Sequence, residues 1–83
     1  MPIPLTLEVG VIYVTKVWSD SWSVFNNNGS YVGNILAEGT RLKLIETGSP
    51  HGSASFEILN GLFKDCTTLV HKRNVSENLL ERG

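Results

Sequence analysis

The segment that decides the fold runs from residue 22 to residue 48 and alternates short apolar runs with turn-forming residues. In order, it reads Trp22-Ser-Val-Phe25, Asn26-Asn-Asn-Gly29, Tyr31-Val-Gly-Asn-Ile-Leu36, Glu38-Gly39 and Arg41-Leu-Lys-Leu-Ile-Glu46. Asn-Gly is a strong short-range hairpin signal, because a type I′ turn requires positive φ at both central residues. Two strands joined in this way, followed by a Glu-Gly break and a third strand, predict an antiparallel meander. We therefore expect a small all-β domain.

Runs rich in β-branched and aromatic residues predict further strands outside this segment. They cover residues 11–17, 56–59, 62–64 and 69–71, with weak pairing over 5–9. A second Asn-Gly pair, at residues 60–61, predicts a hairpin between the strands at 56–59 and 62–64. Gly10 precedes the strand at 11–17 and is expected to mark a bulge or bend. The two prolines within residues 1–4 predict an extended arm.

The sequence near the C-terminus indicates one short helical element. Asn74 stands three residues before Glu77, which is a capping-box spacing with Asn in place of Ser or Thr. We expect one helical turn over about residues 75–81, with Leu79 and Leu80 plugging the mouth of a barrel.

Five to six short strands with turn signals every 8–12 residues are typical of a small barrel or roll, because closure removes exposed sheet edges. The strand spacing and the closing turn favour an SH3-like barrel over an OB barrel. A length of 83 residues predicts one domain over residues 1–83.

Residues 32–46 resemble the bacterial SH3 (SH3b) family, in which a "vIG-x-L" phrase runs through a Lys/Glu-Gly-Thr turn into an alternating strand. The phrase falls on Val32, Gly33, Leu36, Glu38, Gly39, Thr40 and Leu42. Residues 56–61 resemble the aromatic strand and Asn-Gly turn of the family, and residues 69–71 with Leu79 resemble its closing "W-V-x-x-x-x-L". The resemblance covers about half of the chain. It implies an SH3-like fold and the binding of peptidoglycan, peptides or other proteins.

The chain departs from the family at two places. The early Asn-Val-Arg and Gly-Pro turn of the family are replaced by residues 13–16 and a Trp-containing loop, and its Gly-Trp-Val is replaced by residues 68–70. These changes weaken the implied ligand more than the implied fold.

Charge and composition argue against several classes of protein. The net charge is −1, and the seven basic residues are scattered, which argues against a surface that tracks nucleic-acid phosphates. A lone cysteine, Cys66, cannot form an internal disulfide. The N-terminus lacks the pattern of a signal peptide, and no apolar run reaches the ~20 residues of a membrane helix. We therefore expect a cytoplasmic protein.

Four aromatic residues gather around the first hairpin and the loop before it: Trp18, Trp22, Phe25 and Tyr31. One interpretation is a binding platform at one end of the barrel, and the alternative is that two or three of them form the core. By the strand period of two, Trp22 and Phe25 face opposite sides, and Trp18 is the best candidate for exposure because Ser and Asp surround it. The 48–53 loop, with Pro50 and His51, is a second candidate for partner contact.

Other polar residues offer weaker candidates for a functional site. Cys66 and His71, with Asp65 and His51 nearby, could form a thiol nucleophile and its base, but no catalytic signature surrounds them and the alternative is a structural cysteine. Two histidines and one cysteine fall short of a zinc set, and no phosphate-binding loop is present. Lysines at 43, 64 and 72 with Arg73 form either a basic patch or a solvated face. We expect no enzyme activity and no cofactor.

The sequence therefore predicts a non-enzymatic module that binds another protein in the cytoplasm. An intact Met1 and the lack of an attached domain fit a free-standing gene product, of the kind that viruses of bacteria use as inhibitors or accessory factors. The alternatives are a cell-wall or glycan binder of SH3b type, a nucleic-acid-binding small barrel that uses aromatic stacking, and a component of a larger assembly.

Overall fold

Strands make up most of the regular structure of the chain. The computed structural model describes residues 6–47 and 52–83, so the predictions for the first five residues and for residues 48–51 lie outside it. The elements are β1 (Ile12–Thr15), β2 (Ser23–Phe25), β3 (Tyr31–Gly33), β4 (Arg41–Glu46), β5 (Ser53–Ile58), β6 (Thr67–His71), the 3-10 helix η1 (Lys72–Asn74) and β7 (Leu80–Arg82). The predicted all-β class is confirmed, with seven strands among the described residues in place of five to six.

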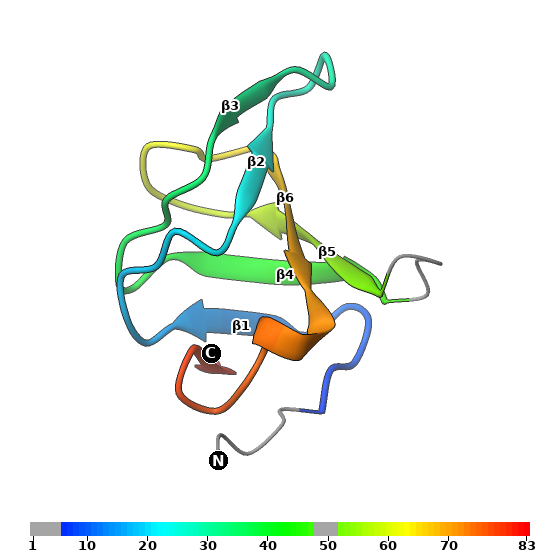
Figure 1. Cartoon of the computed structure of the whole chain (residues 1–83), viewed down its shortest axis with the longest axis vertical. Coiled ribbons are helices and arrows are strands. Elements are labelled where there is room, and N and C mark those ends of the chain that lie inside the picture. Colours follow the sequence, from blue (N-terminus) through cyan, green and yellow to red (C-terminus); the bar gives the residue numbers. More distant parts are fainter. Residues whose placement is uncertain (1–5, 48–51) are drawn as a thin grey trace.

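The strands form one antiparallel sheet with the order β3-β2-β6-β5-β4-β1-β7. The sheet bends sharply, so that β2 and β6 run across the direction of β1 and β4 (Figure 1). This bend lets one face of the sheet enclose a single hydrophobic core cluster. β3 and β7 are the two edges of the sheet, so the predicted closure into a barrel is not confirmed.

The alternation of buried and exposed side chains along the strands shows which residues form the core. In β4, Leu42 and Leu44 are buried while the basic residues between them are exposed, as the sequence pattern predicts. In β5, every second side chain is fully buried. The Phe56 ring lies at the centre and makes edge-to-face contacts with Tyr13 and Trp22, with ring centroids 6.2 and 5.9 Å apart. Such pairs stabilise the core beyond the area that they bury.

The first predicted hairpin is confirmed, but its turn is not type I′. The Gly29 N–H donates to the Asn26 carbonyl at 2.9 Å, and the Asn26 N–H donates to the Ser30 carbonyl at 2.9 Å. Gly29 has a φ of +80°, but Asn28 before it does not have a positive φ, because Asp65 is the one non-glycine residue with positive φ among the described residues. A type I′ turn would require positive φ at both positions. A left-handed glycine alone fits a three-residue loop in which glycine follows a type I turn. The Asn26 Oδ1 accepts from the Asn28 and Ser30 N–H groups at 2.9 and 3.0 Å, which completes the turn.

The predicted meander is wrong after β3. β4 pairs with β1 and β5, and three strands separate it from β3 in the sheet. The crossover at residues 34–40 instead lies against the end of β1, where the Thr15 N–H donates to the Thr40 carbonyl and the Gly39 N–H donates to the Thr15 carbonyl. The Glu-Gly break predicts that a strand ends there, but it does not determine which strand the next one joins.

The second predicted hairpin has a different form, because residues 62–64 belong to a turn and not to a strand. β6 begins at Thr67, and the connection from β5 is a loop over residues 59–66. The Asn60 side chain accepts a hydrogen bond from the Arg41 N–H at 2.8 Å and donates to the Gly39 carbonyl at 3.4 Å. Asn60 therefore ties the loop to the start of β4 and does not occupy a two-residue turn between strands.

The C-terminal helical turn is predicted at the wrong place. The 3-10 helix η1 precedes residues 75–81, and β7 begins within that range. A single hydrogen-bonded turn remains there, because the Leu79 and Leu80 N–H groups donate to the Ser76 carbonyl at 3.0 and 3.1 Å. Both leucines are buried, as expected from their predicted packing role.

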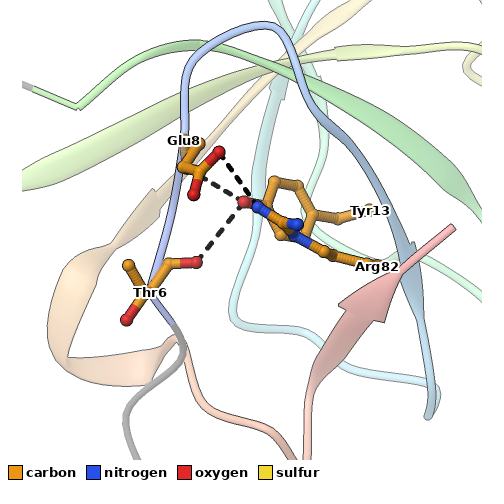
Figure 2. Close-up of polar contacts among 4 residues, drawn as sticks. All are labelled: Thr6, Glu8, Tyr13 and Arg82. Carbon is orange, nitrogen blue, oxygen red and sulfur yellow. Dashed lines mark hydrogen bonds and ion pairs between the residues drawn. The ribbon is translucent and has the colours of Figure 1, made fainter.

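The N-terminal segment is attached to the sheet through Tyr13. This tyrosine is fully buried, its hydroxyl accepts from the Glu8 N–H at 2.9 Å, and it donates to the Thr6 carbonyl at 3.4 Å (Figure 2). The Glu8 carboxylate also lies 3.0 Å from the Arg82 guanidinium, in an exposed ion pair. Residues 6–9 form no strand, and Gly10 makes the predicted bend with a φ of +89°.

Candidate functional site

The four predicted aromatic residues divide between core and surface. Trp22 is 1% exposed and packs on Phe56, so it is a core residue and is not available to a partner. Its Nε1 is buried without a hydrogen-bond partner. Trp18 and Tyr31 are 61% and 59% exposed, and Phe25 is half-buried. The opposite orientation of Trp22 and Phe25 follows the period of two that the sequence predicts.

The exposed aromatics do not form one cluster. Phe25 and Tyr31 stack edge-to-face across the hairpin, with ring centroids 5.9 Å apart. Trp18 belongs to none of the aromatic pairs found among the described residues and lies beside the short bridge between Ser19 and Leu36. Pro50 and His51 lie outside the described residues. The predicted platform is therefore reduced to an aromatic pair on the hairpin and one separate tryptophan.

An apolar pocket lies between two other segments, the crossover after β3 and the loop between β5 and β6. Both segments lie on the same side of the molecule in Figure 1. The pocket volume is about 400 Å³, within the range of small ligand sites. Its lining residues are Gly33, Asn34, Ile35, Leu36, Ala37, Thr40, Ile58, Asn60, Gly61, Leu62 and Phe63. None of these residues is charged, so the pocket is suited to an apolar side chain.

Close packing of Phe63 on Gly33 forms one wall of the pocket. A β-carbon placed on Gly33 would lie 2.8 Å from the Phe63 Cζ, so a side chain at this position would displace the ring. The approach of the Phe63 ring therefore leaves no room for a side chain at this position of the bent strand. The half-buried Phe63 also packs against the core, which fixes its position.

Hydrogen bonds hold the opposite wall. The buried Thr15 hydroxyl donates to the Ala37 carbonyl at 2.7 Å and accepts from the Thr40 N–H at 2.9 Å. The Thr40 hydroxyl also donates to the Ala37 carbonyl at 2.7 Å. The Asn60 side chain joins the other wall to the start of β4. The pocket is therefore preorganised by side-chain contacts with β1 and β4.

Two of the apolar side chains that line the pocket are also exposed. Leu62 is 93% exposed at the rim, and Ile35 is 41% exposed. Val32, which precedes the lining residue Gly33, is 42% exposed. An apolar surface of this kind marks an interaction site more often than a single exposed leucine does. Sequence reasoning missed it because Leu62 was assigned to a strand. The available signal was the pair Leu62-Phe63 directly after Asn-Gly, since two adjacent large apolar residues cannot both face the core of one strand.

A second, more polar hollow of about 280 Å³ lies over β2, β5 and β6. It is lined by Ser21, Ser23, Phe25, Ser53, Leu69, Val70, His71 and Asn74. The His71 Nδ1 accepts from the Arg73 N–H at 3.2 Å and caps η1, so this imidazole has a structural role.

The structure separates the groups considered for catalysis. Cys66 precedes β6 and His71 ends it, so about 16 Å of strand lies between them and the thiol cannot hydrogen-bond to the imidazole. Cys66 is half-buried and packs against the core. Lys64 and Lys72 likewise flank opposite ends of β6 and do not form one basic patch. Within the described residues, no three His, Cys, Asp or Glu side chains are placed to hold a metal ion.

Comparison with protein-family models, with curated proteins and with solved structures finds no match to this chain. Within residues 6–47 and 52–83, no helix has the length and apolar character needed to cross a membrane.

Proposed function

We propose that the chain is a non-enzymatic binding module that acts by protein–protein interaction in the cytoplasm. The observation that carries this proposal is the uncharged pocket of about 400 Å³ with the 93% exposed Leu62 at its rim. Side chains already hold the pocket walls in place, so an apolar side chain from a partner loses little free energy to reorganisation of the site. A phosphate backbone would require basic groups, and the pocket lining carries none.

We further propose that the architecture is SH3-like. The support is the strongly bent antiparallel sheet of short strands and the 3-10 turn η1 between β6 and β7. The resemblance of residues 32–46 to the SH3b family points in the same direction. The exposed Trp18 and the Phe25–Tyr31 pair would then extend the contact with a partner beyond the pocket.

The test uses two isoleucines of similar exposure. Ile35 lines the pocket and is 41% exposed, whereas Ile45 is 47% exposed near the far end of β4, about 16 Å along the strand from the pocket residue Thr40. Immobilised parent, Ile35→Ser and Ile45→Ser proteins are used to capture partners from a lysate of the source cells, and the captured proteins are compared by quantitative mass spectrometry. A protein retained by the parent and by Ile45→Ser, and lost with Ile35→Ser, supports the proposal. Equal capture by all three proteins contradicts it.

A further inference from the structure

The chain contains two Asn-Gly pairs, Asn28-Gly29 and Asn60-Gly61, and both are exposed to solvent. In such a pair the backbone nitrogen of the glycine can attack the side-chain Cγ of the asparagine, because glycine has no Cβ to obstruct the approach. The new N–Cγ bond closes a succinimide ring, the Cγ–Nδ2 bond breaks, and the proton of the glycine nitrogen leaves with the side-chain nitrogen as ammonia. One water molecule then opens the ring and leaves either aspartate or isoaspartate. Exposure alone does not distinguish the two pairs, so their contacts decide which one reacts.

At the second pair, hydrogen bonds hold the side chain that would be attacked. The Asn60 Oδ1 accepts from the Arg41 N–H at 2.8 Å, and its Nδ2 donates to the Gly39 carbonyl at 3.4 Å. The Gly61 N–H donates to no backbone carbonyl among the described residues, so these side-chain contacts are the barrier to ring closure. The Asn60 amide must release both bonds before it can turn back to the Gly61 nitrogen. Release of the amide also detaches the loop from the start of β4.

At the first pair, the side chain is free and only the attacking nitrogen is held. The side-chain hydrogen bonds of this turn use the Asn26 Oδ1, so the Asn28 amide has no partner within the part of the chain that the structure describes. The Gly29 N–H donates to the Asn26 carbonyl at 2.9 Å. This bond lies at the tip of a hairpin whose outer strand β3 has three residues and forms an edge of the sheet. Exposed tips of this kind open locally, so the nitrogen is released without unfolding of the core.

We propose that Asn28 is a site of spontaneous deamidation in the folded protein, and that the hydrogen bonds of Asn60 protect the second Asn-Gly pair. The reaction replaces a neutral amide by a carboxylate, so it makes the net charge of −1 more negative by one unit. Isoaspartate also lengthens the backbone of the turn between Phe25 and Tyr31. These two rings meet edge-to-face across the hairpin with centroids 5.9 Å apart, so the modification alters the exposed aromatic pair.

Peptide mapping by mass spectrometry tests the proposal, because trypsin cleaves after Arg41 and Lys43 and so places the two pairs on different peptides. The folded chain and the chain unfolded in guanidinium chloride are incubated side by side in the same mildly alkaline buffer. In the folded chain, Asn28 is expected to convert at least about tenfold faster than Asn60, which is the factor that one hydrogen bond supplies. In guanidinium chloride neither side chain is held, and the two rates are expected to converge.

Asn28→Ser removes the reactive amide from an exposed position and is the control variant. Ion-exchange chromatography of the folded parent is expected to show an acidic species that accumulates with time, and the folded variant is expected to lack it. A rate at Asn60 equal to or above that at Asn28 in the folded chain overturns the inference, and so does an Asn28 that stays intact while the unfolded chain reacts. A ratio of rates that persists in guanidinium chloride also overturns it, because the contrast would then come from the neighbouring residues in the sequence and not from the hydrogen bonds.

Discussion

Replacement of Thr15 by valine tests how the wall of the pocket is held. The Thr15 side chain is 1% exposed, and its hydroxyl joins the end of β1 to the turn at residues 37–40. Valine has nearly the same shape but cannot donate to the Ala37 carbonyl or accept from the Thr40 N–H. The carbonyl retains its bond from the Thr40 hydroxyl at 2.7 Å. The Thr40 N–H retains only a 3.4 Å contact with the same carbonyl.

The expected cost follows from this remaining contact. A buried donor left without a good acceptor costs about 1–3 kcal/mol. The methyl group that replaces the hydroxyl recovers at most about 0.8 kcal/mol by its burial. We therefore expect Thr15→Val to lower the free energy of unfolding by about 1–2 kcal/mol. For a domain of this size, each kcal/mol corresponds to a decrease of about 4–8 °C in Tm.

Urea unfolding followed by circular dichroism measures this change, with Thr40→Val as the matched control. Thr40 has the same hydroxyl and the same acceptor, but its hydrogen bond is exposed, so water can replace it and the expected loss is about 0.5 kcal/mol or less. A loss for Thr15→Val no larger than that for Thr40→Val would refute the reasoning, because it would mean that the Thr40 N–H does not depend on Thr15.

Three further substitutions test other contacts. Gly33→Ala is expected to displace the Phe63 ring and to lower the free energy of unfolding by about 1–3 kcal/mol. The NMR chemical shifts of the ring should change, and unchanged Phe63 resonances would contradict the close approach. Tyr13→Phe removes a buried hydroxyl and is expected to lower the free energy of unfolding in urea by about 1 kcal/mol. Glu8→Gln removes only an exposed ion pair and is expected to lower it by less than about 0.5 kcal/mol. A larger loss for Glu8→Gln than for Tyr13→Phe would contradict this assignment. Asn60→Ala is expected to lower Tm by about 4–8 °C and to increase amide exchange at the start of β4, while Asn60→Asp keeps the acceptor and retains most of the stability.

The strands were predictable wherever residue type and period agree. β4 alternates in sequence and in burial, and the leucines at 42 and 44 lie in the core as expected. The hairpin between β2 and β3 was also predictable, because its turn is local and Asn26 and Gly29 form it without help from the rest of the chain. Local chemistry is sufficient in these segments.

Predictions failed where a distant contact determines the structure. The Asn60-Gly61 pair indicated a tight hairpin, but the Asn60 side chain binds the backbone of Arg41, which is distant in sequence. Leu62 is consequently exposed in a loop, and the pocket that it borders could not be predicted from the strand pattern. The neighbour of β4 was predicted wrongly for the same reason. The meander predicted β3 as its neighbour, but β4 pairs with β1, and the hydroxyl contacts of Thr15 hold the crossover beside the end of β1.

The contrast between the two tryptophans supplies the protein with built-in optical reporters. Trp22 is enclosed by the core at 1% exposure, so its fluorescence should be blue-shifted and insensitive to iodide until the molecule unfolds. Trp18, at 61% exposure, should emit at longer wavelength and be quenched freely in the native state. Iodide quenching of Trp18 in the native protein thus reports on the solvent around the loop before β2. Loss of the blue-shifted emission of Trp22 reports on unfolding of the core. Folding and surface occupancy can then be followed separately in one sample without any added label.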